Sequence, residues 1–445
     1  MAGSKRAHRT LTTLFVRPAV DLQLPSIYRF SIPRESAETL PLGLVRLASV
    51  VKFGSGHRVA VHDARTEPGG NRALRSVAAI FRPNVAVLWL HPATLGDGLE
   101  AARAVRQAGC ELVLGTGPLV DLWPDGAGRI PELDGLLASA GSSTLLSALD
   151  AVAEGAGSQE LVSVLASSPE ALTDLPVDRK LVDYARYSKG VAPPWPSVAP
   201  VDLSRGRWKQ ALLRRTLPQS GVSPVFLHAE DGQLLPSQVV VNDIKSSTLL
   251  GIRTFDLVAR PGCSPPGGSW LDEFLRTLSP TGGAVQSSLC LRLPVDPAKV
   301  DDIPLLDLPA LGVVAVDLGE VTAGDEMALK AAIGAASRCR RRDLQPTGTL
   351  VVGRPGYGPE VEVRGLERAV GERFPTWAGV EVRLGTVDPG AWGDWLDAPS
   401  PGFRPPGVDD ERTALAQRGR DALAVVPPPP PNLRRLVRWA YRMGR

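Results

Sequence analysis

The stretch Asn84–Leu90, which reads NVAVLWL, is a nearly continuous apolar run. Such a run without polar alternation is typical of a parallel strand that is buried on both faces. Further strands are predicted around it over residues 11–17, 58–63 and 111–114. Helices are predicted between these strands at Leu40–Lys52 and Leu99–Gln107, where apolar residues recur with helical spacing. Strand and helix in alternation predict a doubly wound parallel sheet, whose ligands lie at the carboxyl ends of the strands.

A second series of strands and helices follows the proline-rich segment Val191–Pro200. Its strands are predicted over residues 225–228, 254–258, 289–293, 313–317 and 349–352, with helices over 237–249 and 326–338. This order predicts a (β/α) barrel or partial barrel. The tail after Pro401 contains the polyproline run Pro427–Pro431 and a predicted short basic helix, Asn432–Arg442. The chain is therefore expected to be α/β, with two sheet domains and a small C-terminal extension.

The composition narrows the class of protein. The chain has 445 residues, of which 43% are hydrophobic and 22% charged, and this balance is typical of folded globular domains. The net charge of +3 does not favour a nucleic-acid-binding protein. No run approaches the roughly 18 apolar residues that a membrane-spanning helix needs. The sequence predicts a cytoplasmic protein without a transmembrane segment and without a nucleic-acid partner.

The four cysteines are Cys110, Cys263, Cys290 and Cys339, and no two of them are close in sequence. This spacing excludes a zinc ribbon, a CxxC redox pair and a local three-thiolate iron–sulfur motif. The chain also lacks a GxSxG nucleophile motif and a complete dinucleotide-binding glycine fingerprint. The sequence therefore contains no motif that supports hydrolytic or nicotinamide-dependent chemistry.

Several strings together resemble the cobalamin-binding radical S-adenosylmethionine (SAM) proteins. They are PLGLVRLASVVK at 41–52, GHRVAVHDA at 56–64, GCELVLGTGPL at 109–119, LTDLPVDRKLVDYARY at 172–187, VDLGEVTAGDEMALK at 316–330 and LVVGRPG at 350–356. The resemblance implies a cobalamin-binding-like Rossmann domain over 1–160, a linker over 161–200, a radical-SAM-like partial TIM barrel over 201–395 and a proline-rich tail over 396–445.

The resemblance also implies where cobalamin would bind. The matching loops contain Leu42, Gly43, Thr94 and the run Gly115, Thr116, Gly117 and Pro118, all at the predicted carboxyl edge of the first sheet. Glycine allows the close backbone approach that a large cofactor needs, but turns and helix caps in any doubly wound sheet use the same residue types. His91 follows the central strand and is a candidate cobalt ligand or general base, or a hydrogen-bonded structural residue.

The cluster motif of the family is missing. Ser204-Arg205-Gly206 resembles the sequence that introduces CxxxCxxC, but the three cysteine positions are held by Arg207, Ala211 and Arg214. Alanine cannot ligate iron, and arginine stays protonated and repels it. We therefore expect no [4Fe–4S] cluster, and no metal site at these degenerate cluster positions. The basic residues here are either an anion site or a solvated, salt-bridged loop.

In the second half, Glu320 and Lys330 match positions that face the barrel mouth in the relatives, and an ion pair or a helix surface explains them equally well. Glu320 and His91 are the candidate catalytic residues. Three functions stay open: a cobalamin-binding accessory or non-radical protein of a bacterial biosynthetic pathway, a cluster-independent cobalamin-dependent enzyme such as a polar methyltransferase, and a cofactor-free structural partner of an intact radical SAM enzyme. Cobalamin, SAM and a protein partner are thus expectations of the resemblance.

Overall fold

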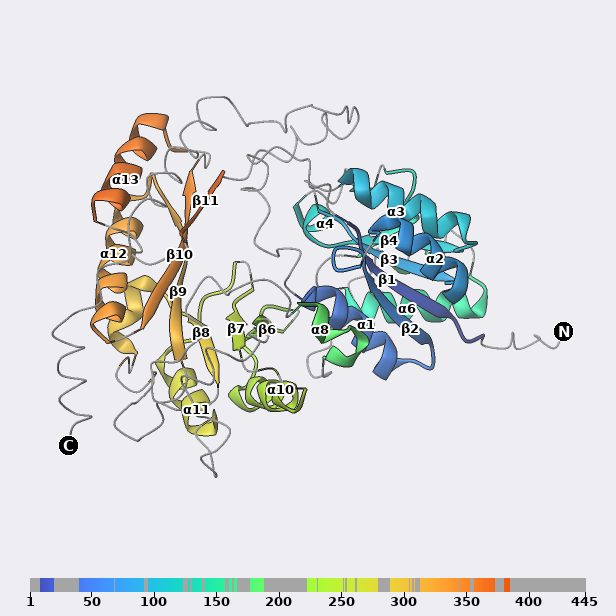
Figure 1. The fold of residues 1–445 in the computed structure, drawn as a ribbon, viewed down its shortest axis with the longest axis horizontal. Coiled ribbons are helices and arrows are strands. Elements are labelled where there is room, and N and C mark those ends of the chain that lie inside the picture. Colours follow the sequence, from blue (N-terminus) through green and yellow to red (C-terminus); the bar gives the residue numbers. More distant parts are fainter. Residues whose placement is uncertain are drawn as a thin grey trace.

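A computed structural model gives the fold of the chain (Figure 1). The residues that it describes are 9–19, 40–67, 69–91, 95–122, 127–128, 130–137, 141–156, 160–161, 164–165, 177–187, 222–229, 231–250, 252, 254–260, 262–278, 289–303, 305, 308, 313–342, 344–352, 356–372 and 380–384. Of the described helices, none is long and apolar enough to cross a membrane.

The first half of the chain forms a five-stranded parallel sheet in the order β2-β1-β3-β4-β5. Its strands are β1 (Thr12–Arg17), β2 (Arg58–Asp63), β3 (Val85–Trp89), β4 (Leu112–Thr116) and β5 (Gly135–Leu137). Its helices are α1 (Leu42–Gly54), α2 (Asn71–Phe81), α3 (Leu95–Gln107), α4 (Pro118–Leu122) and α6 (Ser142–Glu154). The chain runs from β1 outward to β2 and then returns past β1 to β3. This reversal makes the β1/β3 junction the topological switch point, beside which ligands bind in such sheets.

Both faces of this sheet are covered, which explains the continuous apolar run that forms β3. One face packs under α2 and α3 through residues such as Leu74, Ala101 and Leu88. The other face packs under α1 and α6 through residues such as Leu44, Leu145 and Val87. Because alternate residues of β3 enter both cores, neither face of the strand can carry polar side chains. The predicted doubly wound sheet is confirmed.

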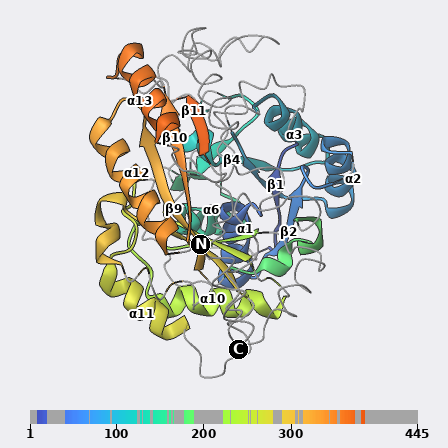
Figure 2. The same ribbon diagram turned by 60° about the vertical axis from the view of Figure 1, so that its left-hand side comes forward.

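The second half forms a six-stranded parallel sheet in the order β11-β10-β9-β8-β7-β6. Its strands are β6 (Val222–Phe226), β7 (Thr254–Val258), β8 (Cys290–Pro294), β9 (Val313–Thr322), β10 (Gln345–Val352) and β11 (Val380–Leu384). Its main helices are α10 (Ser237–Leu249), α11 (Gly268–Leu278), α12 (Glu326–Arg341) and α13 (Pro359–Gly371). Each strand lies beside its successor in the chain, so these helices all fall on one face (Figures 1 and 2). This winding is that of a barrel segment.

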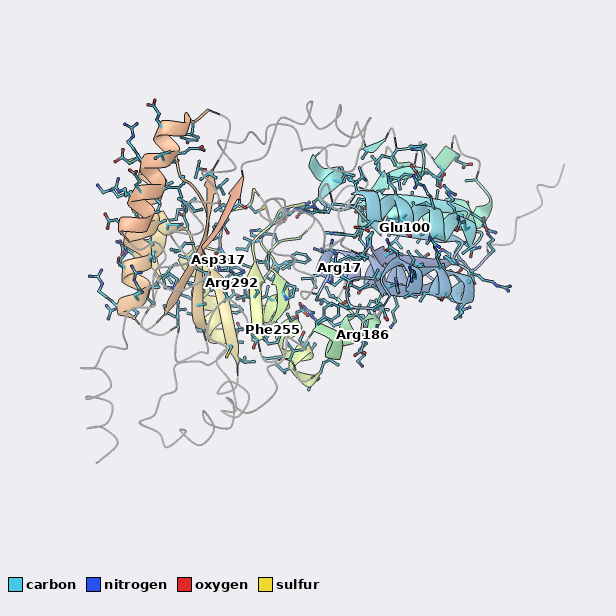
Figure 3. All side chains as sticks on the ribbon, turned by 45° about the horizontal axis from the view of Figure 1, so that its top comes forward. Arg17, Glu100, Arg186, Phe255, Arg292 and Asp317 are labelled. Carbon is cyan, nitrogen blue, oxygen red and sulfur yellow. The ribbon has the colours of Figure 1, made fainter. Side chains whose placement is uncertain are left out.

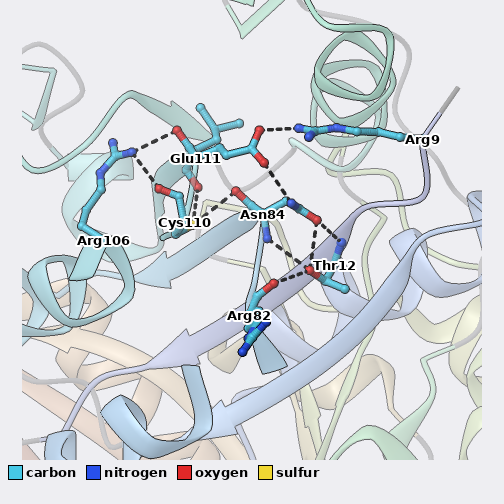
Figure 4. A network of polar contacts seen from close by, with 8 residues as sticks. Arg9, Thr12, Arg82, Asn84, Arg106, Cys110 and Glu111 are labelled. Atoms are coloured by element: carbon cyan, nitrogen blue, oxygen red, sulfur yellow. Dashed lines mark hydrogen bonds and ion pairs between the residues drawn. The ribbon is translucent and has the colours of Figure 1, made fainter. Parts of the chain in front are cut away.

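A network of polar contacts ties together the amino-terminal edge of the first sheet (Figure 4). The side chain of Asn84 accepts a hydrogen bond from the Thr12 backbone (2.9 Å) and donates one to Glu111 (2.9 Å). Glu111 forms an ion pair with Arg9, and Arg106 donates to the backbone carbonyl of Glu111 (3.0 Å). The network joins the starts of β1, β3 and β4 and lies at the edge opposite their carboxyl ends, so we assign it to stability.

The segment 177–187 connects the two halves. It contains a short 3₁₀ helix, Arg179–Leu181, and α8 (Tyr184–Tyr187). The side chain of Tyr187 packs with Leu42 and Val45 of α1, and Phe226 of β6 joins the same apolar cluster. The segment therefore contacts both sheets. The predicted boundaries at residues 160, 200 and 395 stay predictions, and the predicted tail over 396–445 lies outside the described residues.

Most predicted elements match the structure within a few residues, with two corrections in the first sheet. Gly115 and Thr116, predicted as part of a turn, are the last residues of β4, so the turn begins at Gly117. Helix α3 begins at Leu95, four residues earlier than Leu99, because Leu95 and Gly98 also face the core.

Candidate functional site

The carboxyl edge of the first sheet contains most of the predicted cobalamin-site residues. Leu42 and Gly43 form the first turn of α1, His91 follows β3, and the run from Gly115 to Pro118 leads from β4 into α4. The strands β3 and β4 are neighbours, so the segments after them share one edge. His91 is buried, and it forms interactions within the fold. Thr94 lies outside the described residues.

The indole of Trp89 fills the space between two of the glycines at this edge. A Cβ atom added at Gly43 would lie 2.8 Å from the six-membered ring of Trp89. One added at Gly117 would lie 3.0 Å from the same indole and 3.0 Å from the Leu90 carbonyl oxygen. Gly117 also has a φ of +96°, which other residues rarely adopt. Both glycines are therefore required by the position of Trp89, which the sequence did not single out.

The side chain of Thr116 is a polar group at this edge that has no hydrogen-bond partner among the described residues. It is buried, and its Oγ1 has no hydrogen bond among the described residues. A buried hydroxyl without a partner costs about 1–3 kcal/mol, so a ligand that supplied one would gain affinity. The half-buried indole of Trp89 adds a flat apolar surface beside it. The edge thus fits a large cofactor with a flat ring system lying against Trp89, whereas the space between Gly43 and Gly117 is already filled.

A buried ion pair lies at the same edge, between the ends of β1 and β2. The Nε of Arg17 donates to Oδ1 of Asp63 (2.8 Å), and its Nη2 contacts Oδ2. The hydroxyl of Tyr187 donates to Oδ2 of Asp63 (2.7 Å), and burial raises the pKa of that phenol. The Arg17 side chain has no exposed surface, and Figure 3 shows it at the side of the first half that faces the second. The pair joins the first sheet to the connecting segment.

His62 lies next to Asp63 on β2, and its ionisation should make the stability of the fold depend on pH. Burial lowers the pKa of its imidazole, and the Asp63 charge offsets this only partly. The folded protein therefore keeps His62 neutral at pH values where the unfolded chain, with a pKa near 6.5, is protonated. Above that pKa the two states bind the same number of protons. Below it the free energy of unfolding should fall, by at most about 1.4 kcal/mol per pH unit.

Replacing His62 with glutamine should remove this contribution. The difference in unfolding free energy between His62→Gln and the natural protein should be constant above pH 7. It should shift in favour of the variant as the pH falls from 6.5 to 5. Urea unfolding at several pH values measures this difference, and two parallel pH profiles would contradict the assignment.

The cluster positions Arg207, Ala211 and Arg214 lie outside the described residues, so the fit of an iron–sulfur cluster is tested on the thiols instead. Cys290 lies on β8 and Cys339 on α12, whereas Cys110 and Cys263 lie in loops, and all four are free thiols. Burial raises the pKa of Cys110 to about 12 and that of Cys339 to about 11, so both remain thiols at neutral pH. In the described part of the chain no group of three His, Cys, Asp or Glu side chains could hold a metal ion. These residues do not fit a [4Fe–4S] cluster.

The second sheet carries a charged network that the sequence predictions missed. Arg292 of β8 donates from Nε to Oδ1 of Asp256 on β7 (2.7 Å), and its Nη1 lies 3.6 Å from Oδ2 of Asp317 on β9. Figure 3 labels Arg292 and Asp317 near each other on the strands. A usable signal existed in the sequence, because each of these three predicted strands has one charged residue among apolar ones.

The two predicted residues of this half are placed differently. Glu320 lies on β9, opposite Thr349 of β10, and its side chain is exposed. Lys330 lies on α12, where its side chain is also exposed. Helix α12 packs on one face of the sheet through residues such as Leu329 and Ala332. The structure records no contact between Glu320 and Lys330.

Known structures with a similar fold include two of one enzyme, TsrM from Kitasatospora setae, a radical S-adenosylmethionine methyltransferase. One has cobalamin and a [4Fe–4S] cluster bound, and it aligns with a TM-score of 0.55 at 14% identity over 84% of this chain and 75% of TsrM. The other has tryptophan substrate and the SAM analogue aza-SAM bound, with a TM-score of 0.53 at 14% identity over 84% of this chain and 73% of TsrM. At this identity the likeness establishes a shared fold.

The sequence itself has no such match. No protein-family model matches the chain, and no curated protein matches it. The roles of individual residues therefore have to be argued from this chain.

Proposed function

We propose that this chain is a cobalamin-binding, radical-SAM-like protein that has lost its [4Fe–4S] cluster and acts as an accessory or non-radical protein in a bacterial biosynthetic pathway. The observation that carries the proposal is a contrast within one chain. The fold is similar to that of TsrM over 84% of the residues, while the sequence resemblance assigns Arg207, Ala211 and Arg214 to the positions of the three thiolates. Without thiolate ligands the barrel cannot hold the cluster that reductive SAM cleavage requires.

The first sheet would hold the cofactor at its carboxyl edge. Leu42, Gly43, His91, Thr94 and the run from Gly115 to Pro118 are the residues that we assign to this site. Trp89 would form its apolar wall, and the Thr116 hydroxyl would gain the partner that it lacks among the described residues. Cobalamin, when bound, supplies a cobalt centre for methyl-group chemistry. The chain's own part would be to orient the cofactor and to exclude water from it.

The proposal predicts two chemical properties of the purified protein. Protein mixed with hydroxocobalamin should stay coloured through a desalting column, with a stoichiometric amount of cofactor retained. After anaerobic reconstitution with iron and sulfide, the same protein should contain no stoichiometric cluster. Full four-iron occupancy would overturn the loss of the cluster, and a colourless eluate would overturn cobalamin binding.

A matched pair of variants tests the site at the level of one atom. Thr116→Val removes a hydroxyl that has no described partner at the carboxyl edge, and Thr13→Val removes another such hydroxyl nearer the amino-terminal edge of the same sheet. Thr116→Val should weaken hydroxocobalamin binding by about 2- to 10-fold, as expected for one hydrogen bond. Thr13→Val should leave it unchanged. Equal affinities of the two variants would exclude Thr116 from the site.

One observation favours a second candidate, a cofactor-free structural partner of an intact radical SAM enzyme. Trp89 already occupies the space between Gly43 and Gly117, so these glycines are explained without a ligand. Under this alternative the desalted protein is colourless but binds a second protein that carries an intact cluster motif. Co-purification of the chain with such a protein separates the two candidates.

A further inference from the structure

The charged network of the second sheet lies on the face opposite its helices. Phe255, Leu291 and Val316 enter the core under α10, α11 and α12. Successive residues of a strand point to opposite faces, so Asp256, Arg292 and Asp317 lie on the other one. Their side chains are 15%, 20% and 26% exposed, so solvent reaches them.

The contacts within the network leave one carboxylate poorly compensated. Arg292 contacts both carboxylate oxygens of Asp256, and the two residues are cross-strand neighbours. Oδ1 of Asp317 accepts a hydrogen bond from the Gly319 backbone (3.2 Å) and lies 3.5 Å from the Thr347 hydroxyl. Among the residues that the structure describes, the partner of Oδ2 of Asp317 is Arg292 at 3.6 Å, which is longer than a hydrogen bond. Two carboxylates against one guanidinium leave the three residues with a formal charge of −1.

Such a network is unusual on this face of a (β/α) sheet. The interior of a closed (β/α) barrel is filled by branched apolar side chains, and replacing a buried ion pair by apolar residues is often neutral or stabilising. An additional, partly buried carboxylate without a full counter-charge costs free energy. A ligand that carries a positive charge would remove this cost.

We propose that Asp317, held in place by Arg292 and Thr347, binds the protonated amino group of a small organic ligand on the helix-free face of the second sheet. The ammonium donates to Oδ2 of Asp317, the oxygen that the protein's own donors leave least satisfied. Arg292 keeps Asp256 neutralised, so that Asp317 remains the acceptor. The ligands of the second half of the chain would then be small organic amines. Their binding requires neither cobalamin nor a cluster.

The test compares two probes that differ only in charge. In ¹⁹F NMR, 4-fluorobenzylamine should show saturable line broadening with the full-length protein, whereas the neutral 4-fluorobenzyl alcohol should not. Asp317→Asn should weaken amine binding by at least about tenfold, as expected for a charge-assisted hydrogen bond. The matched control is Asp272→Asn, which removes a carboxylate from the exposed face of α11 in the same half of the chain.

Two outcomes would overturn the proposal: equal binding of amine and alcohol, or equal amine affinity of Asp317→Asn and the natural protein. If Asp317→Asn does not fold, the probe comparison on the natural protein and the charge-retaining variant Asp317→Glu decide the question. Asp317→Glu should keep selectivity for the amine. Hydroxocobalamin retention and iron content report on the proposed function separately, because they depend on other residues.

Discussion

Replacing Asp63 with alanine should lower the free energy of unfolding by about 3–5 kcal/mol. The substitution leaves the fully buried guanidinium of Arg17 without both of its contacts to the Asp63 carboxylate. It also removes the acceptor of the Tyr187 hydroxyl and of the Arg65 backbone amide. A whole domain is stable by only about 5–15 kcal/mol, so this loss is a large fraction of the total. Urea unfolding of the full chain, followed by circular dichroism, measures it.

Two further variants separate the buried charge from the other contacts of Asp63. Tyr187→Phe removes the hydrogen bond to Asp63 and should cost less than Asp63→Ala, about 1.5–3 kcal/mol, because the acceptor is charged. The double variant Arg17→Met with Asp63→Leu removes both charges and should be more stable than Asp63→Ala alone. If the double variant were less stable than the single one, the loss of the Asp63 charge beside the Arg17 guanidinium would not be the cause.

The strands that could be predicted are those with an unambiguous apolar pattern. The run Asn84–Leu90 contains β3. Both faces of that strand are buried, so nearly every residue of the run is apolar. The shorter β5, with three residues, carries too little pattern to be recognised. Helix α2 was also missed, although its buried residues Asn71, Leu74 and Ala78 recur with helical spacing.

The sequence predicted at which edge of the sheet the candidate site lies. It did not predict the side-chain contacts within the site. Residues that follow parallel strands meet at one edge, so Gly43, His91 and Gly117 could be placed together from the order of the strands. That the indole of Trp89 fills the space between two glycines depends on side-chain packing, which periodicity does not encode. The Arg17–Asp63 pair joins residues 46 positions apart through the register of β1 and β2. The register of two strands is set only in the folded sheet. No local sequence pattern therefore predicts that these two residues pair.

We expect the second large loss of stability from a substitution in the connecting segment. Arg179 of this segment forms hydrogen bonds with the second half of the chain. Its Nε donates to the Ser223 hydroxyl (3.2 Å), and its Nη2 donates to the Pro224 carbonyl oxygen (2.8 Å) and to Oδ2 of Asp243 (3.0 Å). The Arg179 side chain is almost fully buried. On the other side of the segment, the Asp178 backbone amide donates to the Ser49 hydroxyl of α1 (2.8 Å). Consecutive residues thus bind the two halves.

Arg179→Met should therefore cost about 3–5 kcal/mol, because Asp243 loses its partner and two acceptors on β6 lose a donor. The backbone amides of Leu181 and Val182, which bond within the 3₁₀ turn, should exchange with solvent faster. Urea unfolding gives the first quantity and hydrogen-exchange mass spectrometry of the segment gives the second.

The matched control for Arg179 is an exposed ion pair that joins α1 to the same segment. Lys52 is 44% exposed and pairs with Asp178 at 2.5 Å, so Lys52→Ala removes a surface salt bridge to the neighbouring residue. Such pairs contribute about 0–1 kcal/mol, and exchange in the segment should barely change. If Lys52→Ala and Arg179→Met had equal effects, the buried guanidinium would not be what holds the segment. The connection between the halves would then depend on the apolar cluster around Tyr187.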